Sequence, residues 1–470
     1  MVSKELQKRI EEYAANSRKA LVEDLSTLVR IPSVSHFGAD GLPFGKGVAN
    51  ALDKALEMAE GYGLTTENCG YWYGLAHYGE GDATIGLFSH LDVVPEGNNW
   101  IYAPYEPLEK DGLLIGRGST DNKNAAVVSL HVMKGLRELG IPLRSKITLF
   151  FGCSEETGMQ DIDKFVEEQP MPDFSIVPDT TFPVCHGEKG ILSFQAHCST
   201  PWTKVTGLSG GVADNVVPDL ASATLANEPA LLAELTAAAE KAKGIAVAAD
   251  GNAIVITATG RTAHAAQPEN GVNAIHLLMK FLAGIQGIGA DREICAFAAE
   301  TTSDCYGEHL GIAVEDEPSG KLTCISGLAA TEDGHLVMHY NVRYPVTHKG
   351  ELVKADLEKT LSPKGWTVEG FTDSLPIYLP ADNPNVQELC RIYGEVTGRE
   401  AVPYVMGGGT YARHLKNAVG FGMETDTSTG LPEGHGRAHE PDEAMIIDEL
   451  VDAVKIYLLS IVEVDALLHK

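Results

Sequence analysis

The sequence predicts an α/β protein in which a mostly parallel central sheet is interrupted by a large α+β domain. Up to about residue 186, short apolar runs alternate with segments of helical periodicity, and a parallel sheet needs such helical connections. The pattern changes to strand-like alternation at residue 187, and amphipathic helices return after residue 380. We therefore expect one domain formed by residues 1–186 and 381–470, with an inserted lid of two lobes over residues 187–380.

The first domain opens with an amphipathic helix that ends at the Ile31-Pro32 pair, because a proline stops a helix. The apolar run TIGLFSHLDVV then predicts a strand, and a loop rich in proline and glycine follows it. A helical run begins at Asn124 and closes on Gly140, and KITLFF predicts the next strand. Strand, helix and strand in this order are typical of a parallel sheet.

The sequence pattern of the insertion predicts mainly strands. The stretches that alternate in strand fashion are ILSFQAHCS, AIVITATGRTAH, LTCISGLAATEDGHLVMHYNVRYPV and WTVEGFTDSLPIYLP. Two helical segments are expected between them, near residues 219–243 and 271–286. At roughly 190 residues, the insertion is as large as a domain.

Composition and charge exclude several classes of partner. The chain has 470 residues with 36 Lys+Arg against 65 Asp+Glu, and a net charge of −29 would repel nucleic acids and anionic membranes. The N-terminus is charged throughout, and no apolar stretch reaches the roughly 18 residues that span a bilayer. Eight cysteines are scattered singly without a Cys-x-x-Cys pair, which is typical of reduced thiols. We expect a cytoplasmic protein without a nucleic-acid or membrane partner.

Titratable residues stand at the ends of five apolar runs or helix starts. They are His90 and Asp92 in FSHLDVV, Asp121 in GRGSTDNKN, Glu155 and Glu156 in FFGCSEETG, Asp179 in FSIVPD and His439 in GRAHEPDE. Each alone has an ordinary explanation as a solvated strand end, a helix cap or a surface residue. Together they supply the ligand chemistry of a two-metal hydrolytic centre, and α/β sheets bind ligands at the carboxyl edge of their strands.

Glu155 and Glu156 form the most unusual pair. Adjacent carboxylates at the end of an apolar strand repel each other and are costly to desolvate, so they need a cation, a proton or open solvent. The pairs at 11–12 and 167–168 lie in charged helical stretches, where a solvated helix face explains them. The pair at the end of ITLFF has no such surroundings.

These stretches occur together in an order that resembles the M20 family of metallopeptidases, and within it the bacterial branch of PepV-like or Xaa-His dipeptidases. The matching stretches are LVRIPSVS, SHLDVVPEG, GRGSTDNKN, GCSEETG, VPDTTFPV, GRTAHAAQPENGVNA, GGGTYAR and AHEPDE. They span nearly the whole chain. The resemblance implies a zinc-peptidase-like catalytic domain with an inserted lid.

The resemblance also implies a set of metal ligands. One metal ion would be held by His90 and Asp179, and the second by Glu156 and His439. Asp121 would bridge the two ions and be followed by a cis peptide bond. The implied cofactors are two divalent ions per subunit, with Zn²⁺ favoured by the histidine and carboxylate ligands and Mn²⁺ or Co²⁺ as alternatives.

Further roles follow from the same resemblance. Asp92 would accept a ring N–H of His90, Glu155 would be the general base, and His264 in GRTAHAAQ would donate a hydrogen bond to the oxyanion. The expected substrate contacts are Asn215, Arg343, Gly408, Gly409 and Thr410. The long lid implies a monomer, or a homodimer that catalysis does not need.

Three functions fit these expectations. The first is a hydrolase that cleaves unblocked dipeptides, including β-alanyl or Xaa-His dipeptides, through a metal-activated water and Glu155. The second is an N-acyl-amino-acid deacylase of the desuccinylase or deacetylase type, which nothing near Asn215 or Arg343 excludes. The third is a noncatalytic peptide-binding protein, against which the presence of the base and of every ligand argues.

Overall fold

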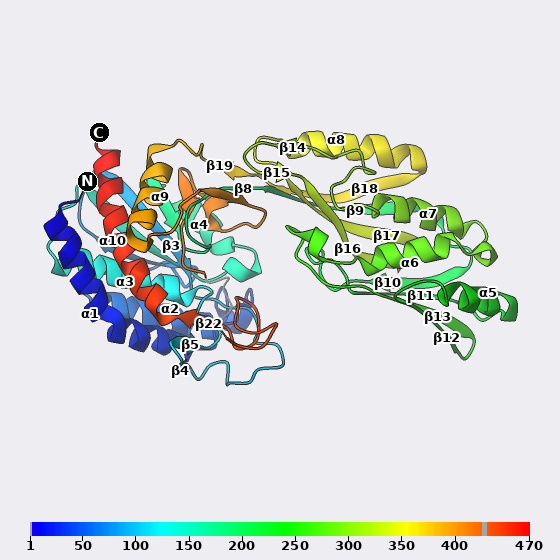
Figure 1. Cartoon of the computed structure of the whole chain (residues 1–470), viewed down its shortest axis with the longest axis horizontal. Coiled ribbons are helices and arrows are strands. Elements are labelled where there is room, and N and C mark those ends of the chain that lie inside the picture. The colour runs from blue at the N-terminus through cyan, green and yellow to red at the C-terminus, as the bar shows by residue number, and fades with distance from the viewer. Residues whose placement is uncertain (1, 425–429) are drawn as a thin grey trace. The chain divides into compact units, whose positions relative to one another are not determined.

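The computed structural model describes residues 2–424 and 430–470. The chain divides into two compact units, each described by itself (Figure 1). Unit 1 comprises Met1–Gly187, Leu379–Tyr404 and Thr410–Lys470, and unit 2 comprises Glu188–Tyr378 and Val405–Gly409. The short segment Val405–Gly409 therefore returns to unit 2 after the chain has re-entered unit 1.

Most strands of a nine-stranded mixed sheet lie in unit 1 and form its centre. Its order is β1, β2, β6, β3, β7, β21, β8 and β19, with β20 paired to β8. The central strands β6, β3, β7 and β21 run parallel, whereas β1 and β2 form an antiparallel edge. The mostly parallel centre confirms the fold class predicted from the sequence. The bounds are β1 (Thr65–Asn68), β2 (Gly74–Tyr78), β3 (Ala83–His90), β6 (Ser145–Gly152), β7 (Phe174–Val177), β8 (Cys185–Glu188), β19 (Ile377–Tyr378), β20 (Tyr404–Met406) and β21 (Ala418–Gly420).

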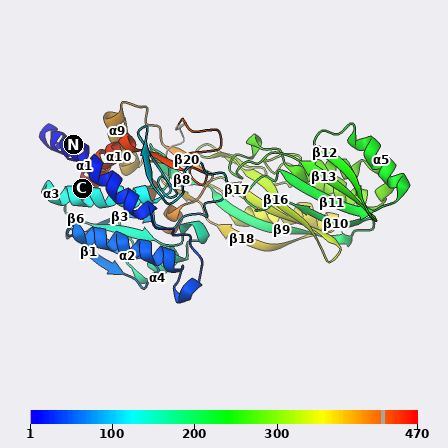
Figure 2. The ribbon, with the colours of Figure 1, turned by 90° about the horizontal axis from the view of Figure 1, so that it is seen from below.

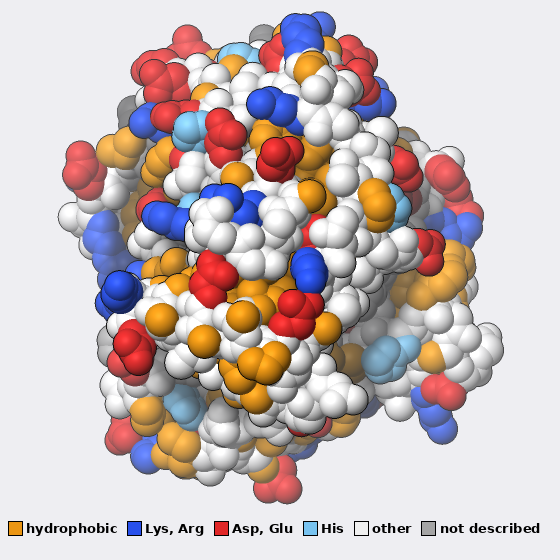
Figure 3. Space-filling model, turned by 90° about the vertical axis from the view of Figure 1, so that its right-hand side faces the viewer, with side chains coloured by type: hydrophobic (Ala, Val, Ile, Leu, Met, Phe, Trp, Pro, Cys, Tyr) orange, Lys and Arg blue, Asp and Glu red, His pale blue; other side chains and the backbone are white. Residues whose placement is uncertain are grey.

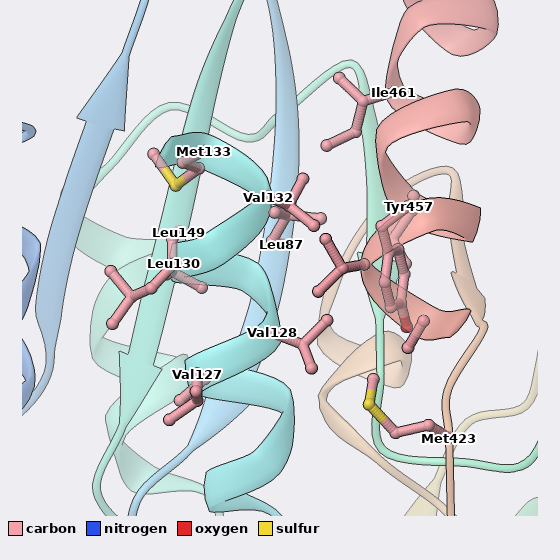
Figure 4. Packing of buried hydrophobic residues seen from close by; sticks show 14 of the residues in the cluster. Leu87, Val127, Val128, Leu130, Val132, Met133, Leu149, Met423, Tyr457 and Ile461 are labelled. Carbon is pink, nitrogen blue, oxygen red and sulfur yellow. The ribbon is translucent and has the colours of Figure 1, made fainter. Parts of the chain in front are cut away.

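Helices cover both faces of this sheet (Figure 2). α1, α3 and α10 pack on one another over one face, and α2 contributes buried side chains to the same core. α4 lies over the other face, where its Phe165 packs against Phe88 and Phe150. Figure 4 shows Val128 and Tyr457 among the buried side chains packed between α3 and α10. The bounds are α1 (Lys4–Val29), α2 (Lys46–Gly61), α3 (Lys123–Glu138), α4 (Gln160–Glu168), α9 (Pro384–Thr397) and α10 (Ile447–Leu468).

Two predicted helix ends are confirmed. α1 stops at Val29, just before Pro32, which has no N–H to continue the helix. α3 ends at Glu138, and Gly140 follows in the left-handed region with φ 61, where a residue without a Cβ is favoured.

The carboxyl ends of β3, β6 and β7 meet at one edge of the sheet. His90 at the end of β3 pairs in register with Gly152 at the end of β6. Asp179 follows β7 by two residues, and Glu155 follows β6 by three. A separate three-stranded sheet joins β22 (Ala444–Ile446), β5 (Leu113–Ile115) and β4 (Leu108–Lys110). Because parallel strands end at the same edge, side chains far apart in sequence are delivered to one place.

Unit 2 is built on an eight-stranded antiparallel sheet with the order β12, β13, β11, β10, β16, β17, β9 and β18. Its apolar core lies between this sheet and its helices. The strands are β9 (Gly190–Pro201), β10 (Val205–Gly210), β11 (Leu220–Ala226), β12 (Ile245–Asp250), β13 (Ala253–Thr259), β16 (Thr323–Glu332), β17 (His335–Tyr344) and β18 (Trp366–Ser374), with a small hairpin of β14 (Glu315–Asp316) and β15 (Gly320–Lys321). The helices are α5 (Pro229–Ala239), α6 (Ala274–Ala283), α7 (Asp291–Thr301) and α8 (Gly350–Leu361).

The helix predicted near residues 219–243 is wrong in its first half. Residues 220–226 form β11, whose side chains alternate between buried and less buried positions, and the helix α5 starts only at Pro229. Small residues such as those in LASATLA fit a strand or a helix equally well, so pairing with β10 and β13 decides the conformation. The segment predicted near residues 271–286 is α6, capped by the Asn273 side chain.

The described surface carries both signs of charge. On the face drawn in Figure 3, acidic and basic side chains are interspersed with apolar ones. None of the helices in the described ranges is long and apolar enough to cross a membrane.

Candidate metal centre

His90 ends β3, and its two ring nitrogens have different partners. Nδ1 lies 2.9 Å from the backbone carbonyl oxygen of Asp92 and 3.4 Å from the Asp92 carboxylate. Nε2 lies 3.1 Å from Asp121 Oδ1 and 3.7 Å from Asp179 Oδ1. An Nδ1–H that donates to the Asp92 carbonyl leaves the Nε2 lone pair facing two carboxylates, as a metal ligand requires.

The Asp92 carboxylate has partners that the sequence does not indicate. It is fully buried and accepts hydrogen bonds from the backbone N–H groups of Glu155, at 3.2 Å, and Glu156, at 3.1 Å. Asp92 therefore orients His90 mainly through its backbone carbonyl, while its carboxylate holds the turn that carries the two glutamates.

Asp121 lies between two histidines. Its Oδ1 is 3.1 Å from His90 Nε2 and its Oδ2 is 3.0 Å from His439 Nε2. Burial raises the pKa of the Asp121 carboxyl, but the hydrogen bonds to His439 and His90 outweigh it and hold that pKa well below its usual range. The peptide bond from Asp121 to Asn122 is cis, as the family resemblance implies. A carboxylate with one oxygen toward each histidine has the geometry to bridge two cations.

Glu156 and His439 form the outer side of the cluster. His439 Nε2 lies 3.0 Å from Glu156 Oε1 as well as 3.0 Å from Asp121. Hydrogen bonds to Asp121 and Glu156 raise the pKa of His439 to about 11. Burial and the charge of Asp121 raise the pKa of Glu156 to about 7. The His439 side chain is 55% exposed, so a ligand can reach this side from solvent.

Glu155 faces another part of the cluster, although it neighbours Glu156 in a short 3₁₀ turn rather than on an extended strand. Its carboxylate lies with His90 and Asp179, and burial and the charge of Asp179 raise its pKa well above the usual range. Asn122 donates a hydrogen bond of 2.9 Å from Nδ2 to Asp179 Oδ1 and so fixes that carboxylate. The two glutamates thus have separate surroundings.

Three groups of side chains among the described residues could hold a metal ion. They are His90, Asp121 and Glu156; His90, Glu155 and Asp179; and Asp121, Asp179 and Glu424. Each pair of groups shares one residue, which is His90, Asp121 or Asp179. Imidazole and carboxylate donors arranged in this way fit divalent cations such as Zn²⁺.

Glu424 is the member of these groups that sequence reasoning missed. It follows β21 at the end of the apolar run AVGFGM, which is the same signal that marks Asp92, Glu155 and Asp179. Burial and the charges of Asp179 and Asp121 raise its pKa well above the usual range.

A further buried carboxylate supports the end of β6. Asp161 of α4 accepts hydrogen bonds from the N–H groups of Cys153, at 2.6 Å, and Ser154, at 2.9 Å. The buried Tyr411 hydroxyl donates to the same carboxylate. Asp161 therefore links the strand end before Glu155 to the segment after Thr410.

Two of the predicted lid residues lie side by side in unit 2. The carbonyl oxygen of Asn215 accepts a 3.0 Å hydrogen bond from Ala265 N–H, next to an isolated bridge between Val216 and His264. The Nδ1 of His264 accepts a 3.2 Å hydrogen bond from Ala266 N–H. This contact leaves the ring proton on Nε2, so His264 presents a hydrogen-bond donor.

Arg343 is buried on β17 and has protein partners. Its Nε donates to Asn341 Oδ1 at 2.8 Å, and its Nη1 donates to the Gly407 carbonyl at 3.0 Å. This second contact fixes the backbone directly before Gly408 and Gly409. The neighbouring Thr410 belongs to unit 1, where its hydroxyl accepts the N–H of Ala412 and caps a 3₁₀ turn.

Comparison with known proteins shows the family of the chain. Residues 86–463 match the family described as "Peptidase family M20/M25/M40". A "Beta-Ala-Xaa dipeptidase" of Lactobacillus delbrueckii subsp. lactis is 31% identical over 96% of this chain and 97% of its own length. A "Putative dipeptidase YtjP" of Bacillus subtilis (strain 168) is also 31% identical, over 95% of this chain and 97% of its own.

Solved structures with similar folds include an aminoacylhistidine dipeptidase from Vibrio alginolyticus, with a TM-score of 0.59, 14% identity, and coverage of 94% of this chain and 96% of that one. Human carnosine dipeptidase 1 has a TM-score of 0.56 at 16% identity and covers 98% of this chain and 100% of its own. At these identities the likeness concerns the fold alone. With the family match and the two curated relatives, it confirms the resemblance found in the sequence: the chain belongs to peptidase family M20/M25/M40 and is a metallopeptidase.

Proposed function

We propose that this metallopeptidase is a dipeptidase that hydrolyses the peptide bond of unblocked dipeptides, β-alanyl and Xaa-His dipeptides among them. The observation that carries the proposal is the position of Asp121 between His90 and His439, at 3.1 and 3.0 Å. Two relatives that are similar to this chain over nearly its full length support the same activity, because one is named a Beta-Ala-Xaa dipeptidase and the other a putative dipeptidase.

The metal ligands in this proposal are those expected from the sequence. His90 and Asp179 would hold one divalent ion, Glu156 and His439 a second, and Asp121 would bridge both. When bound, such ions lower the pKa of water and polarise the scissile carbonyl. Zn²⁺ suits this mixture of imidazole and carboxylate donors.

Glu155 is the proposed general base. Its carboxylate lies in the cluster with His90 and Asp179 but is not needed in the ligand set above. It would accept the proton of the attacking water and return it to the leaving amine.

His264 is the proposed donor to the oxyanion, because its Nδ1 accepts the Ala266 N–H and its Nε2 carries the proton. Asn215 and the backbone of Gly408 and Gly409 remain proposed substrate contacts, with Thr410 beside them. Arg343 already donates a hydrogen bond to the Gly407 carbonyl. Its proposed role is therefore to fix the glycine loop as well as to meet a substrate carboxylate.

Glu424 bears on the choice between a dipeptide and an N-acyl amino acid. The metal-binding groups contain five carboxylates, and bound cations favour their ionised form. When all five are ionised, they carry one negative charge more than two divalent cations bring. An ammonium group on the substrate would balance this charge, and a free dipeptide carries one whereas an N-acyl amino acid does not. The surplus carboxylate therefore favours unblocked substrates.

A substrate panel tests the proposal. Metal-loaded protein should hydrolyse free dipeptides such as β-Ala-His far faster than N-acetyl or N-succinyl amino acids. EDTA should abolish the activity, and Zn²⁺, Mn²⁺ or Co²⁺ should restore it. Hydrolysis of the N-acyl substrates alone would establish a deacylase instead, and tight dipeptide binding without turnover would establish a noncatalytic protein. We also propose that the protein is a monomer. Size-exclusion chromatography coupled to light scattering tests this proposal.

A further inference from the structure

We infer that Glu443 is a positioning residue of the metal centre: its carboxylate fixes the backbone that carries Asp121 and, through Arg117, the loop that carries His439. The inference rests on the metal centre of the proposed function and adds two residues to which no role has been given. Both are buried, with exposures of 0% for Glu443 and 1% for Arg117.

One carboxylate oxygen of Glu443 accepts hydrogen bonds from the turn that carries Asp121. Oε1 accepts hydrogen bonds from the backbone N–H groups of Gly118 at 3.1 Å, Thr120 at 2.9 Å and Asp121 at 3.0 Å. The backbone adds two contacts, because the Glu443 carbonyl accepts Gly116 N–H at 2.8 Å and the Ser119 hydroxyl at 3.1 Å. The whole turn from 116 to 121 is thereby held on one residue.

The other oxygen of Glu443 binds Arg117, which extends the network. Arg117 Nη1 lies 2.6 Å from Oε2, and its Nη2 donates to the carbonyls of Glu96 at 3.3 Å and His439 at 3.4 Å. The guanidinium also lies 5.2 Å from the centre of the Trp100 ring. One buried cation thus joins the loop after His90 and Asp92 to the loop of His439.

His439 needs such a contact, because its backbone is strained. Its φ is 66°, in the left-handed region that side chains with a Cβ rarely adopt. The Arg117 contact to the His439 carbonyl holds the residue in this conformation, from which its ring meets Asp121 and Glu156.

The pair cannot easily rearrange. Removal of either partner would leave a buried charge uncompensated, which is strongly unfavourable. Groups that orient metal ligands from outside the ligand set change metal affinity by about 10- to 100-fold when they are replaced. The same loss is expected here, because both the bridging carboxylate and a histidine ligand depend on this pair.

The test compares Glu443→Gln with a matched control in unit 2. Glutamine keeps an oxygen for the three N–H groups but removes the charge opposite Arg117. Asp291 is the control, because it is also fully buried and accepts three consecutive backbone N–H groups, from Thr203, Lys204 and Val205 at 2.7 to 2.9 Å. Asp291→Asn therefore makes a similar change in a unit that supplies none of the proposed metal ligands.

Zinc affinity is measured by competition with a chromophoric chelator, and melting of the metal-free proteins is measured alongside. We expect Glu443→Gln to bind Zn²⁺ about 10- to 100-fold more weakly than the unchanged protein, and Asp291→Asn to bind it within about twofold. Equal zinc affinities for Glu443→Gln and the unchanged protein, or equal losses in both variants, would overturn the inference.

Arg117→Met is the second variant, useful if Glu443→Gln fails to fold. It leaves Glu443 its three N–H donors and removes the charge opposite its carboxylate, together with the links to the Glu96 and His439 carbonyls. At least a tenfold loss of zinc affinity is expected, and an unchanged affinity would contradict the role of the pair. The chelator assay uses no substrate, so it stays readable even if the unchanged protein binds zinc but does not cleave dipeptides.

Discussion

The carboxyl edge of the unit 1 sheet and the interior of the unit 2 sheet use buried polar groups differently. At the unit 1 edge, Asp92, Asp161 and Glu443 are buried carboxylates that accept backbone N–H groups of turns around the metal centre. In unit 2, buried polar contacts include neutral pairs such as Thr301 with Tyr340. Unit 2 also has a buried carboxylate that holds a turn, Asp291, but unit 1 gathers three of them where parallel strands end together, around turns that carry other charged side chains.

This difference has a topological cause. Parallel strands bring their carboxyl ends to one edge, so β3, β6 and β7 deliver His90, Glu155 and Asp179 to one place. Antiparallel strands alternate in direction, and their ends are divided between two edges. The comparison can be tested at four positions, in order of decreasing expected effect.

The largest effect is expected for Glu155→Gln. Loss of the general base should lower kcat for a free dipeptide by about 10²- to 10⁴-fold while the bound zinc, measured by mass spectrometry, stays unchanged. Glu167→Gln changes an exposed glutamate of α4 and should have no effect. A Glu155→Gln enzyme within tenfold of the unchanged one would remove Glu155 from the mechanism.

Tyr411→Phe tests the buried charge directly. It removes a hydroxyl that donates to the Asp161 carboxylate, so the free energy of unfolding should fall by about 2 kcal/mol. Tyr340→Phe removes a buried hydroxyl that meets the neutral Thr301 at 2.9 Å, and a loss of about 1 kcal/mol is expected. Urea-induced unfolding measures both, and equal losses would show that charge does not distinguish the two regions.

Glu424→Gln tests the surplus carboxylate. KM for free dipeptides should rise about tenfold, which corresponds to about 1.4 kcal/mol, while kcat and the zinc content remain nearly the same. Binding of a desamino analogue, which lacks the ammonium group, should not change. A fall in zinc content would show instead that Glu424 is a metal ligand.

The smallest effect is expected at His276 in unit 2. Burial, and then the charge of Lys280, lower its pKa from the ordinary value of 6.5. The unfolded chain therefore binds a proton that the folded one rejects, so the free energy of unfolding should fall as the pH drops below 6.5. His276→Gln should reduce this pH dependence of the melting temperature. The exposed His36 is the control position, and an equal change in His36→Gln would contradict the assignment.

Much of the fold was predictable, because apolar runs and helix ends leave local signals. Pro32 and Gly140 mark helix ends that the structure confirms. The strand at residues 220–226 was not predictable. Its small residues have no strong preference for strand or helix and form a strand only through pairing with β10 and β13.

The residues of the candidate site also divide into those that the sequence indicates and those that only the structure reveals. Residues at the ends of apolar runs, such as His90 and Asp179, could be singled out from the sequence, and the structure brings them within 3.7 Å. Glu424 gave the same local signal, but no family motif pointed to it. Glu443 stands in the motif AHEPDE, yet its partners lie more than 300 positions away, so only the structure reveals what it does.

The path of the chain limits how the two units could be separated or exchanged. Val405–Gly409 belongs to unit 2 although the rest of the insertion ends at Tyr378. This short segment supplies the Met406 carbonyl to Lys189 N–H and the Gly407 carbonyl to Arg343. An insertion cut out as residues 188–378 would leave both groups without these partners. Exchange of this unit between related enzymes, in evolution or in the laboratory, therefore requires the transfer of two separate segments of the gene rather than of one continuous piece.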